Sequence, residues 1–292
     1  MKPAPFKYHD PQSLSELVDL TATLEDSKIL AGGQSLMPMM NMRFVTPDDV
    51  VDINNISELN FIESKNGKLK IGALTRQKDI INSKQVSRVA PIIREALLNV
   101  GHLQTRNRGT LGGSLCHIDP SAELPAIASL YDATMFVDNK NGQRELPISE
   151  WFLAYMIPNL GDDDILTSIS IPIWSVNHGY AFIEFARRHG DFAICAAGAL
   201  IEIDDKNNIS KAAIIIAGAD VKPIRLFGLE KNLIGQIANE KTFLEAEEEV
   251  KKIDAISDAY YSVAYRQRLS ATLVNRALKI ATKRAGRSIK NG

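Results

Sequence analysis

The stretch that organises this chain is residues 105–125, TRNRGTLGGSLCHIDPSAELP. Glycines stand among hydroxyl side chains in its first half, and an acidic, proline-marked segment closes it. Glycine and proline both weaken the interior of helices and strands, so we expect a loop here. A glycine-rich loop can turn backbone N–H groups toward an anion. A shorter stretch of the same kind, AGGQSL, occupies residues 31–36. Together the two predict a site for one ligand that carries phosphates.

The composition is that of an ordinary globular protein. The chain has 292 residues, 45% of them hydrophobic and 24% charged, which is enough for two or three domains with cores of their own. Its 34 basic and 35 acidic residues nearly cancel, which argues against nucleic acid or an acidic membrane surface as a partner. We see no signal peptide and no apolar run that could span a bilayer, so we expect a cytoplasmic protein.

The chemistry-bearing side chains are sparse. The two cysteines, Cys116 and Cys195, lie far apart and match no metal-ligand spacing, so we expect no metal site and no iron–sulfur cluster within this chain. No spacing typical of a Ser-His-Asp triad, a zinc protease or a catalytic carboxylate pair stands out. We therefore expect no catalytic side chains. Chemistry carried by a bound redox cofactor would account for that.

The order of elements favours an α+β fold. In the first part we expect helices alternating with short strands, and after Pro172 several strands in near succession followed by helices. Such clustering of strands favours α+β over a doubly wound sheet, and we place a domain boundary near residues 172–180. The expected helices are 13–24, 75–83, 88–99, 123–131, 228–235, 242–253 and 258–285, and the expected strands are 28–31, 50–53, 69–74, 135–137, 165–171, 180–187, 193–203 and 211–218.

Each candidate site also has a simpler interpretation. A glycine pair after a strand is typical of a tight turn without any ligand, and neither glycine stretch has the spacing of a Rossmann or P-loop fingerprint. Asp119 and Glu123 offer acceptors that suit ribose or adenine donors, or they cap a loop. Arg106 and Arg108 are compatible with phosphate neutralisation and equally with a solvated basic loop. The residues alone leave these alternatives open.

The two glycine stretches resemble a known family. Residues 31–36 followed by Pro38 and Arg43, residues 106–113, and Asp119-Pro120 are similar to the FAD-binding medium subunit of molybdenum hydroxylases, the carbon monoxide dehydrogenase and xanthine dehydrogenase group. The similarity extends to residues 179–193. It implies an FAD-binding domain of the vanillyl-alcohol-oxidase (PCMH) type at residues 1–175, with subdomains at about 1–57 and 58–175. A C-terminal domain of a three-stranded sheet with helices would occupy residues 176–292.

The resemblance also implies a cofactor site. Residues 31–35 and 110–114 would hold the pyrophosphate of FAD, Leu111 would press on one face of the isoalloxazine, and the acidic turn would serve the ribityl, ribose and adenine part. Ser114, Glu123 and Phe192 stand where the family usually has Asn, Asp and often Tyr. The full set implied as cofactor-binding is Ala31, Gly32, Gly33, Gln34, Ser35, Leu36, Thr110, Leu111, Gly112, Gly113, Ser114, Asp119, Glu123, Ile165 and Phe192.

The resemblance finally implies partners. The substrate would be oxidised at a molybdenum cofactor in a large molybdopterin-binding subunit, and electrons would pass through two [2Fe–2S] clusters of a small subunit to FAD in this chain. The assembly would be a dimer of heterotrimers. Two alternatives remain: a self-contained FAD-dependent oxidase or reductase of the same fold, and a non-catalytic module that binds a phosphate ligand. The sequence leaves open the electron acceptor and the substrate, whether carbon monoxide, an N-heterocycle, a purine or an aldehyde.

Overall fold

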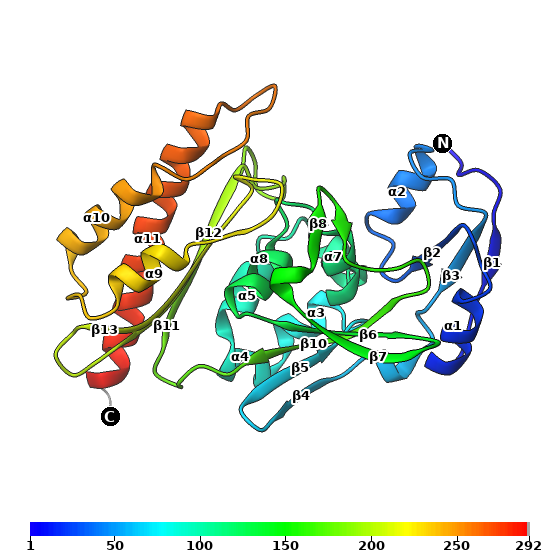
Figure 1. Ribbon diagram of the computed structural model, residues 1–292, viewed down its shortest axis with the longest axis horizontal. Helices are drawn as coiled ribbons and strands as arrows, with labels where there is room; N and C mark the ends of the chain where they lie inside the picture. Colours follow the sequence, from blue (N-terminus) through cyan, green and yellow to red (C-terminus); the bar gives the residue numbers. More distant parts are fainter. Residues whose placement is uncertain (291–292) are drawn as a thin grey trace.

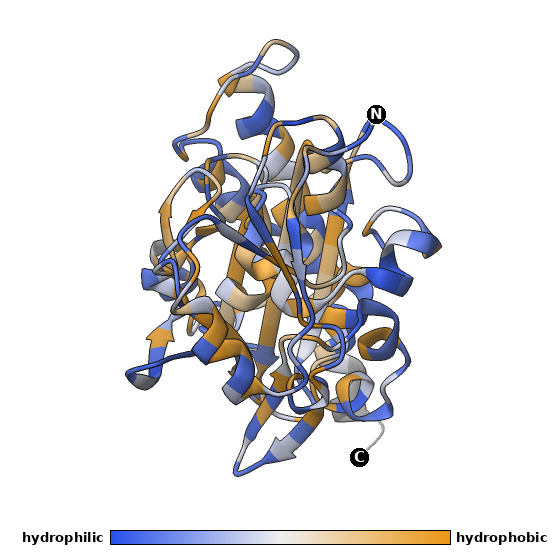
Figure 2. Cartoon of the chain, turned by 90° about the vertical axis from the view of Figure 1, so that its right-hand side faces the viewer, coloured by the Kyte–Doolittle hydropathy of each residue, from blue (hydrophilic) through white to orange (hydrophobic). Residues whose placement is uncertain are grey.

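The computed structural model describes residues 1–290, with side chains described as far as residue 286. Among these residues the strands form sheets of three, five and four strands and a small two-stranded sheet. Figure 1 shows the three larger sheets following one another along the longest axis of the molecule. Figure 2 shows apolar strand segments in the interior and hydrophilic residues on the loops around them. This mixture of packed helices with mainly antiparallel sheets confirms the α+β prediction.

The N-terminal part is a small parallel sheet with two helices beside it. Ser13 begins the first helix, because its side chain accepts a hydrogen bond from the backbone N–H of Glu16. This is the capping contact that the sequence predicts. Leu17 of that helix is fully buried in one cluster with Val51. The strand order is β1-β3-β2, and the elements are β1 (Lys7–His9), α1 (Leu14–Thr21), β2 (Ser27–Leu30), α2 (Leu36–Asn41) and β3 (Asp49–Asp52).

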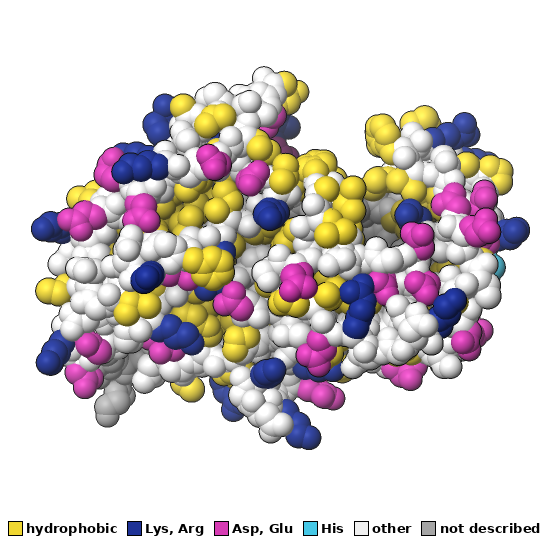
Figure 3. Space-filling view, viewed as in Figure 1, with side chains coloured by type: hydrophobic (Ala, Val, Ile, Leu, Met, Phe, Trp, Pro, Cys, Tyr) yellow, Lys and Arg dark blue, Asp and Glu magenta, His cyan; other side chains and the backbone are white. Residues whose placement is uncertain are grey.

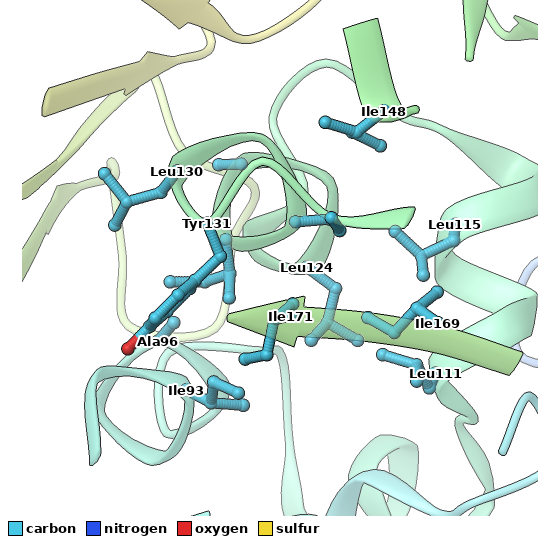
Figure 4. Packing of buried hydrophobic residues seen from close by; sticks show 14 of the residues in the cluster. Ile93, Ala96, Leu111, Leu115, Leu124, Leu130, Tyr131, Ile148, Ile169 and Ile171 are labelled. Carbon is cyan, nitrogen blue, oxygen red and sulfur yellow. The ribbon is translucent and has the colours of Figure 1, made fainter. Parts of the chain in front are cut away.

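The middle part is an antiparallel sheet packed against helices, with the strand order β4-β5-β10-β6-β7. Figure 4 shows Ile169 and Ile171 of its central strand among side chains of three of these helices. The strands are β4 (Ile62–Lys65), β5 (Lys68–Gly72), β6 (Thr134–Asn139), β7 (Gly142–Pro147) and β10 (Ile165–Pro172). The helices are α3 (Gln77–Asn82), α4 (Lys84–Val89), α5 (Pro91–Leu97), α6 (Leu103–Arg108), α7 (Leu111–His117) and α8 (Glu123–Leu130). Short pieces complete this part: η1 (Ser57–Leu59), η2 (Ile148–Glu150), β8 (Phe152–Ala154) and β9 (Ile157–Pro158).

The C-terminal part is an antiparallel sheet, β11-β12-β13-β14, followed by helices. The first three strands lie close to the predicted positions. The last strand has only two residues and pairs with the edge of β13, which is too short to leave an alternation pattern in the sequence. It is a strand beyond the expected three. The elements are β11 (Gly179–Phe185), β12 (Cys195–Ile203), β13 (Ile209–Ala217), β14 (Ile224–Arg225), α9 (Phe227–Leu233), α10 (Glu240–Val250) and α11 (Val263–Lys290).

The C-terminal sheet buries both of its faces. Along β12, Ala196 and Leu200 belong to the core of the middle part, whereas Ala197 and Ala199 belong to the core beneath α10 and α11. Successive side chains of a strand point to opposite faces, so one apolar strand serves two cores. Figure 1 shows α9, α10 and α11 on the outer face of this sheet, and α5 and α8 on the inner one. The middle and C-terminal parts are therefore joined by a continuous apolar contact.

Residues 105–125, expected to be a loop, are largely helical, which corrects the prediction. The Thr110 side chain caps α7 by accepting a hydrogen bond of 3.0 Å from the Gly113 N–H, and such a cap offsets the poor helix propensity of glycine. A Cβ atom at Gly112 would come within 2.6 Å of the Ala73 Cβ. Glycine is therefore needed here for close packing of a helix and not for a turn.

Candidate cofactor site

The two glycine stretches lie against each other. A Cβ atom at Gly32 would overlap the Arg108 carbonyl and lie 2.9 Å from the Gly109 Cα, so only glycine allows the two backbones to approach this closely. The first stretch leads from β2 into α2 and the second leads from α6 into α7. The segments that lead into α2 and α7 are thus neighbours. Figure 3 shows the surface hollowed on this side of the molecule, between the region of α2 and that of β8.

The first stretch presents free backbone donors. Gly33 has a φ of 70°, a left-handed conformation that turns the chain sharply and favours glycine. Its carbonyl accepts from the Met37 N–H at 3.2 Å, and the Ser35 carbonyl accepts from the Met39 N–H at 3.1 Å. The N–H groups of residues 34–36 find no acceptor among the described residues. Unpaired N–H groups that precede a helix are suited to an anionic ligand.

The second stretch differs, because its donors are already engaged. The N–H groups of residues 111–114 donate in chain order to Thr75 O at 3.0 Å, Ala73 O at 2.8 Å, Thr110 Oγ1 at 3.0 Å and Thr110 O at 3.3 Å. These N–H groups are therefore not free to bind an anion, which corrects the expectation that the backbone of this stretch points them at one. What the stretch offers a ligand is open space, since a Cβ atom at Gly113 would meet only Thr110 Oγ1, at 2.8 Å. The half-buried Ser114 adds a hydroxyl beside it.

Two apolar members of the expected set lie in cores. Leu111 is 2% exposed, and Figure 4 shows it beside Ile169 and Leu115. A flavin could meet only the small exposed part of this side chain, so the expected contact stays a prediction. Ile165 is buried at the start of β10 in the cluster against which Ala31 packs. This contact places the beginning of β10 behind the first glycine stretch.

The acidic turn leads into a carboxylate pair. Asp119 accepts from the Ser121 N–H at 2.8 Å and so caps its own turn. Burial, together with the nearby Glu184, raises the pKa of Glu123 to about 8, and burial raises the pKa of Glu184 to about 7. Glu123 begins α8 and Glu184 lies on β11, so the pair spans the contact between the middle and C-terminal parts. Glu184 is not among the predicted site residues, although alternation along β11 places it on the same face as the buried Phe182.

Phe192 lies apart from the glycine stretches on the segment between β11 and β12 and is 71% exposed. The segment turns at Gly190, whose φ is 89°. A Cβ atom at Gly190 would lie 2.8 Å from the His102 Cε1, so this segment packs just ahead of α6. The segment therefore lies beside the start of α6, which leads into the second stretch, while the role of the Phe192 ring stays a prediction.

Two polar residues that the sequence analysis missed connect the glycine stretches. Asn54 donates to the Ala31 carbonyl at 2.9 Å, and Arg76 donates both to the Asn54 side chain and to the Arg108 carbonyl. No described side chain forms an ion pair with Arg76 or Arg108. Free N–H groups, an open glycine and cationic groups without carboxylate partners fit a ligand with a pyrophosphate.

Comparison with known proteins identifies the family. A family model of the FAD-binding domain in molybdopterin dehydrogenase matches residues 4–174. The chain belongs to the FAD-binding subunits of molybdenum hydroxylases. A model of the carbon monoxide dehydrogenase flavoprotein C-terminal domain matches residues 180–281. The predicted family, its FAD cofactor and its oxidoreductase class are confirmed.

Relatives of full length support the same assignment. The chain is 35% identical to the 6-hydroxypseudooxynicotine dehydrogenase complex subunit alpha of Paenarthrobacter nicotinovorans, covering 98% of this chain and 97% of that protein. It is 37% identical to caffeine dehydrogenase subunit beta of Pseudomonas sp. (strain CBB1), covering 97% of each. A chain of carbon monoxide dehydrogenase from Hydrogenophaga pseudoflava has the same fold, with a TM-score of 0.93, 31% identity, and coverage of 97% of this chain and 99% of that chain. These relatives are subunits, so this chain is one component of a larger enzyme.

Membrane insertion through a helix finds no support. None of the described helices combines the length and the apolar character that crossing a bilayer requires.

Proposed function

We propose that this medium subunit carries electrons within a molybdenum hydroxylase. It takes them from two [2Fe–2S] clusters of a small subunit onto FAD and passes them to an external acceptor, while a large molybdopterin-binding subunit oxidises the substrate. The observation that carries the proposal is the backbone contact between the two glycine stretches at the starts of α2 and α7. It brings two distant segments together, so that donors of one and open space of the other would hold the pyrophosphate of a dinucleotide.

The roles of the residues follow from what each can offer. The N–H groups of residues 34–36 would hold the pyrophosphate, while Gly113 leaves it room and the Ser114 hydroxyl donates to it. Asp119 and Glu123 would accept from hydroxyl groups of the sugar chain, and Leu111, Ile165 and Phe192 would border the remaining parts. FAD, when bound, supplies chemistry in one- and two-electron steps. The chain binds and orients it, so no catalytic side chain is needed.

Finer features of the assembly belong to the same proposal. We take residues 1–175 as the FAD-binding domain, with subdomains at about 1–57 and 58–175, and residues 176–292 as the C-terminal domain. The assembly would be a cytoplasmic dimer of heterotrimers. The names of relatives refer to nitrogen-containing compounds, to glyceraldehyde and to carbon monoxide. Since the large subunit binds the substrate, this chain does not select among these classes.

Reduction of the purified full chain tests the proposal. The chain should carry flavin absorbance and stay oxidised with candidate organic substrates alone. Reduction should follow when the small and large subunits and a substrate are added, and the assembled complex should contain molybdenum and iron. Unassisted turnover would instead show a self-contained oxidase or reductase. A colourless protein that takes up no FAD would show a module of a different kind.

A further inference from the structure

Arg76 donates a hydrogen bond to the second glycine stretch and another to Asn54, which in turn bonds to the first glycine stretch. It lies in the segment that joins β5 to α3, far in sequence from both stretches. One terminal nitrogen donates to the Arg108 carbonyl, directly ahead of Gly109 in the second stretch. The other donates to the Asn54 side-chain oxygen. A guanidinium can make two such bonds at once because its donors form a rigid planar fork.

Asn54 continues this connection to the first stretch. Its side-chain nitrogen donates to the Ala31 carbonyl at 2.9 Å, directly ahead of the glycine pair. The Asp52 carboxylate accepts from the Asn54 backbone N–H at 2.9 Å and also from the Asn54 side-chain nitrogen, and this second bond helps to fix the orientation of the amide. A continuous chain of hydrogen bonds therefore runs from the Ala31 carbonyl through Asn54 and Arg76 to the Arg108 carbonyl.

The backbone beside Arg76 holds the second stretch directly. Residues 76 and 110 form an antiparallel bridge. The Gln77 N–H donates to the Gly109 carbonyl at 2.9 Å, and the Leu111 N–H donates to the Thr75 carbonyl at 3.0 Å. The second stretch is thus attached to the Arg76 segment by main-chain bonds. Among the described residues, the first stretch is linked to it through the Arg76 and Asn54 side chains and lies close to the second at Gly32.

The charge at Arg76 has no ion-pair partner among the residues that the structure describes. The guanidinium is half-buried, and burial and the neighbouring Arg108 lower its pKa. An arginine that serves only the fold is more often paired with a carboxylate when it is desolvated. The nearby carboxylates of Asp52 and Asp79 lie beyond ion-pair distance.

We propose that Arg76 is a positioning residue that sets the distance between the two glycine stretches, so that one pyrophosphate fits between them. The inference rests on the proposed cofactor site. The side chain keeps the first stretch, which has the free N–H groups, opposite the open face of Gly113. Its charge, which forms no direct ion pair with a described carboxylate, favours a dianionic group at the same junction.

The test compares two flavins on variants of the full chain. FAD and riboflavin are titrated into the flavin-free protein, and binding is followed by quenching of flavin fluorescence. Arg76→Met removes the fork but keeps the length of the side chain, and we expect the Kd for FAD to rise about thirtyfold, from the loss of hydrogen bonds that involve a charged group. Riboflavin has no phosphate, so its weaker affinity should stay unchanged. Arg88→Met, at an exposed arginine on α4, is the matched control and should alter neither affinity.

Two further variants separate positioning from a general structural role. Arg76→Lys keeps the charge but has one nitrogen for two distant acceptors, so we expect partial recovery of FAD affinity. If Arg76→Met fails to fold, the comparison of FAD with riboflavin is made on Arg76→Lys. Asn54→Ala combined with Arg76→Met should be little worse than Arg76→Met alone, because both act through one connection. The flavin-free Arg76→Met protein should lose some stability with its two intrachain hydrogen bonds, while its circular dichroism spectrum stays that of the wild type.

Several outcomes would overturn the inference. They are an unchanged Kd for FAD in Arg76→Met, equal losses for FAD and riboflavin, or independent effects of the Asn54 and Arg76 changes. Gly113→Val distinguishes this failure from a failure of the site itself. If Gly113→Val keeps its flavin, the cofactor site is wrong. If Gly113→Val loses flavin while Arg76→Met keeps it, the site stands and only the role of Arg76 fails.

Discussion

The two glycine stretches look alike in sequence and do different things in the structure. In residues 31–36 a left-handed glycine turns the chain, and the following N–H groups have no partner among the described residues. In residues 111–114 the N–H groups donate to protein acceptors. There Gly112 packs against Ala73 at the end of β5, and Gly113 borders open space. One stretch supplies donors and the other supplies room. A ligand held between them depends on both, but for different physical reasons.

The comparison is sharpest within the second stretch, at two adjacent glycines. Gly112 faces the protein, where a Cβ atom would lie 2.6 Å from the Ala73 Cβ and 2.9 Å from the Ala73 carbonyl. Gly113 faces outward and would meet only the Thr110 hydroxyl. Substitutions at these neighbours should therefore affect different properties, stability at one and flavin binding at the other.

The largest effect is expected from Gly112→Val. The new side chain overlaps Ala73 and disrupts the hydrogen bond of 2.8 Å from the Gly112 N–H to the Ala73 carbonyl. We expect the free energy of unfolding to fall by about 3 kcal/mol or more, from overpacking together with loss of this bond. Thermal unfolding of the flavin-free chain measures this loss of stability. The exposed Gly67→Ala change is not a suitable control, because the φ of 72° at Gly67 would add backbone strain of its own. A thermal midpoint equal to that of the wild type would contradict the packing argument.

The next effect is expected from Gly113→Val, which should remove FAD and leave the fold intact. Its side chain occupies the space into which we place the pyrophosphate, and the only close neighbour is Thr110 Oγ1. We expect the Kd for FAD to rise about a hundredfold, equivalent to about 2.7 kcal/mol. The ratio of flavin to protein absorbance after purification checks this, with circular dichroism as the control for folding. Full flavin content would show that the ligand does not approach this glycine.

The sequence predicts some of these features because they are local. The capping box at Ser13 and Glu16 predicts α1, and apolar runs bounded by turns predict the three long strands of the C-terminal sheet. The break between α4 and α5 is missed, although Pro91 disfavours helical backbone at the residue before it. Capping by Thr110 overrides the glycine content of α7, so the predicted loop becomes a helix.

The rest of the site depends on contacts between distant segments. Gly112 and Gly113 differ only because Ala73 packs against one of them. Asn54 and Arg76 acquire their roles from the carbonyls of Ala31 and Arg108, which no local pattern brings together. Glu123 and Glu184 meet only when β11 packs beside α8. A sequence pattern can identify the glycine stretches, but it cannot assign donors to one and space to the other.

A smaller effect is expected from Gly33→Ala in the first stretch. Here the φ of 70° places a Cβ atom in a strained conformation, 3.1 Å from the Met37 Cγ and 3.2 Å from the Leu30 Cδ1. We expect a loss of about 1–2 kcal/mol of stability, from the left-handed backbone of a residue with a side chain. FAD affinity should fall along with it, since relaxing the turn moves the donors of residues 34–36. Chemical denaturation and FAD titration measure the two losses. A drop in stability with unchanged FAD affinity would show that these donors do not hold the ligand.

The smallest effect is expected from pH, and it should involve only the second stretch. Residues 31–36 contain no titratable side chain, whereas the second stretch runs on to Asp119 and to Glu123, which is paired with Glu184. Both pKa values of the pair are raised, to about 8 and about 7, so the folded chain holds protons that the unfolded chain has released. Stability should therefore fall as pH rises from about 5 to about 8.

Glu184→Gln removes one of these protonation steps, so the variant should be more stable than the wild type at about pH 8, by on the order of 1 kcal/mol after allowance for solvent screening. Thermal midpoints across this range measure the slope, with Glu145→Gln on the exposed edge of β7 as the control. Equal slopes for Glu184→Gln and the wild type would show that the Glu123–Glu184 pair does not cause the pH dependence.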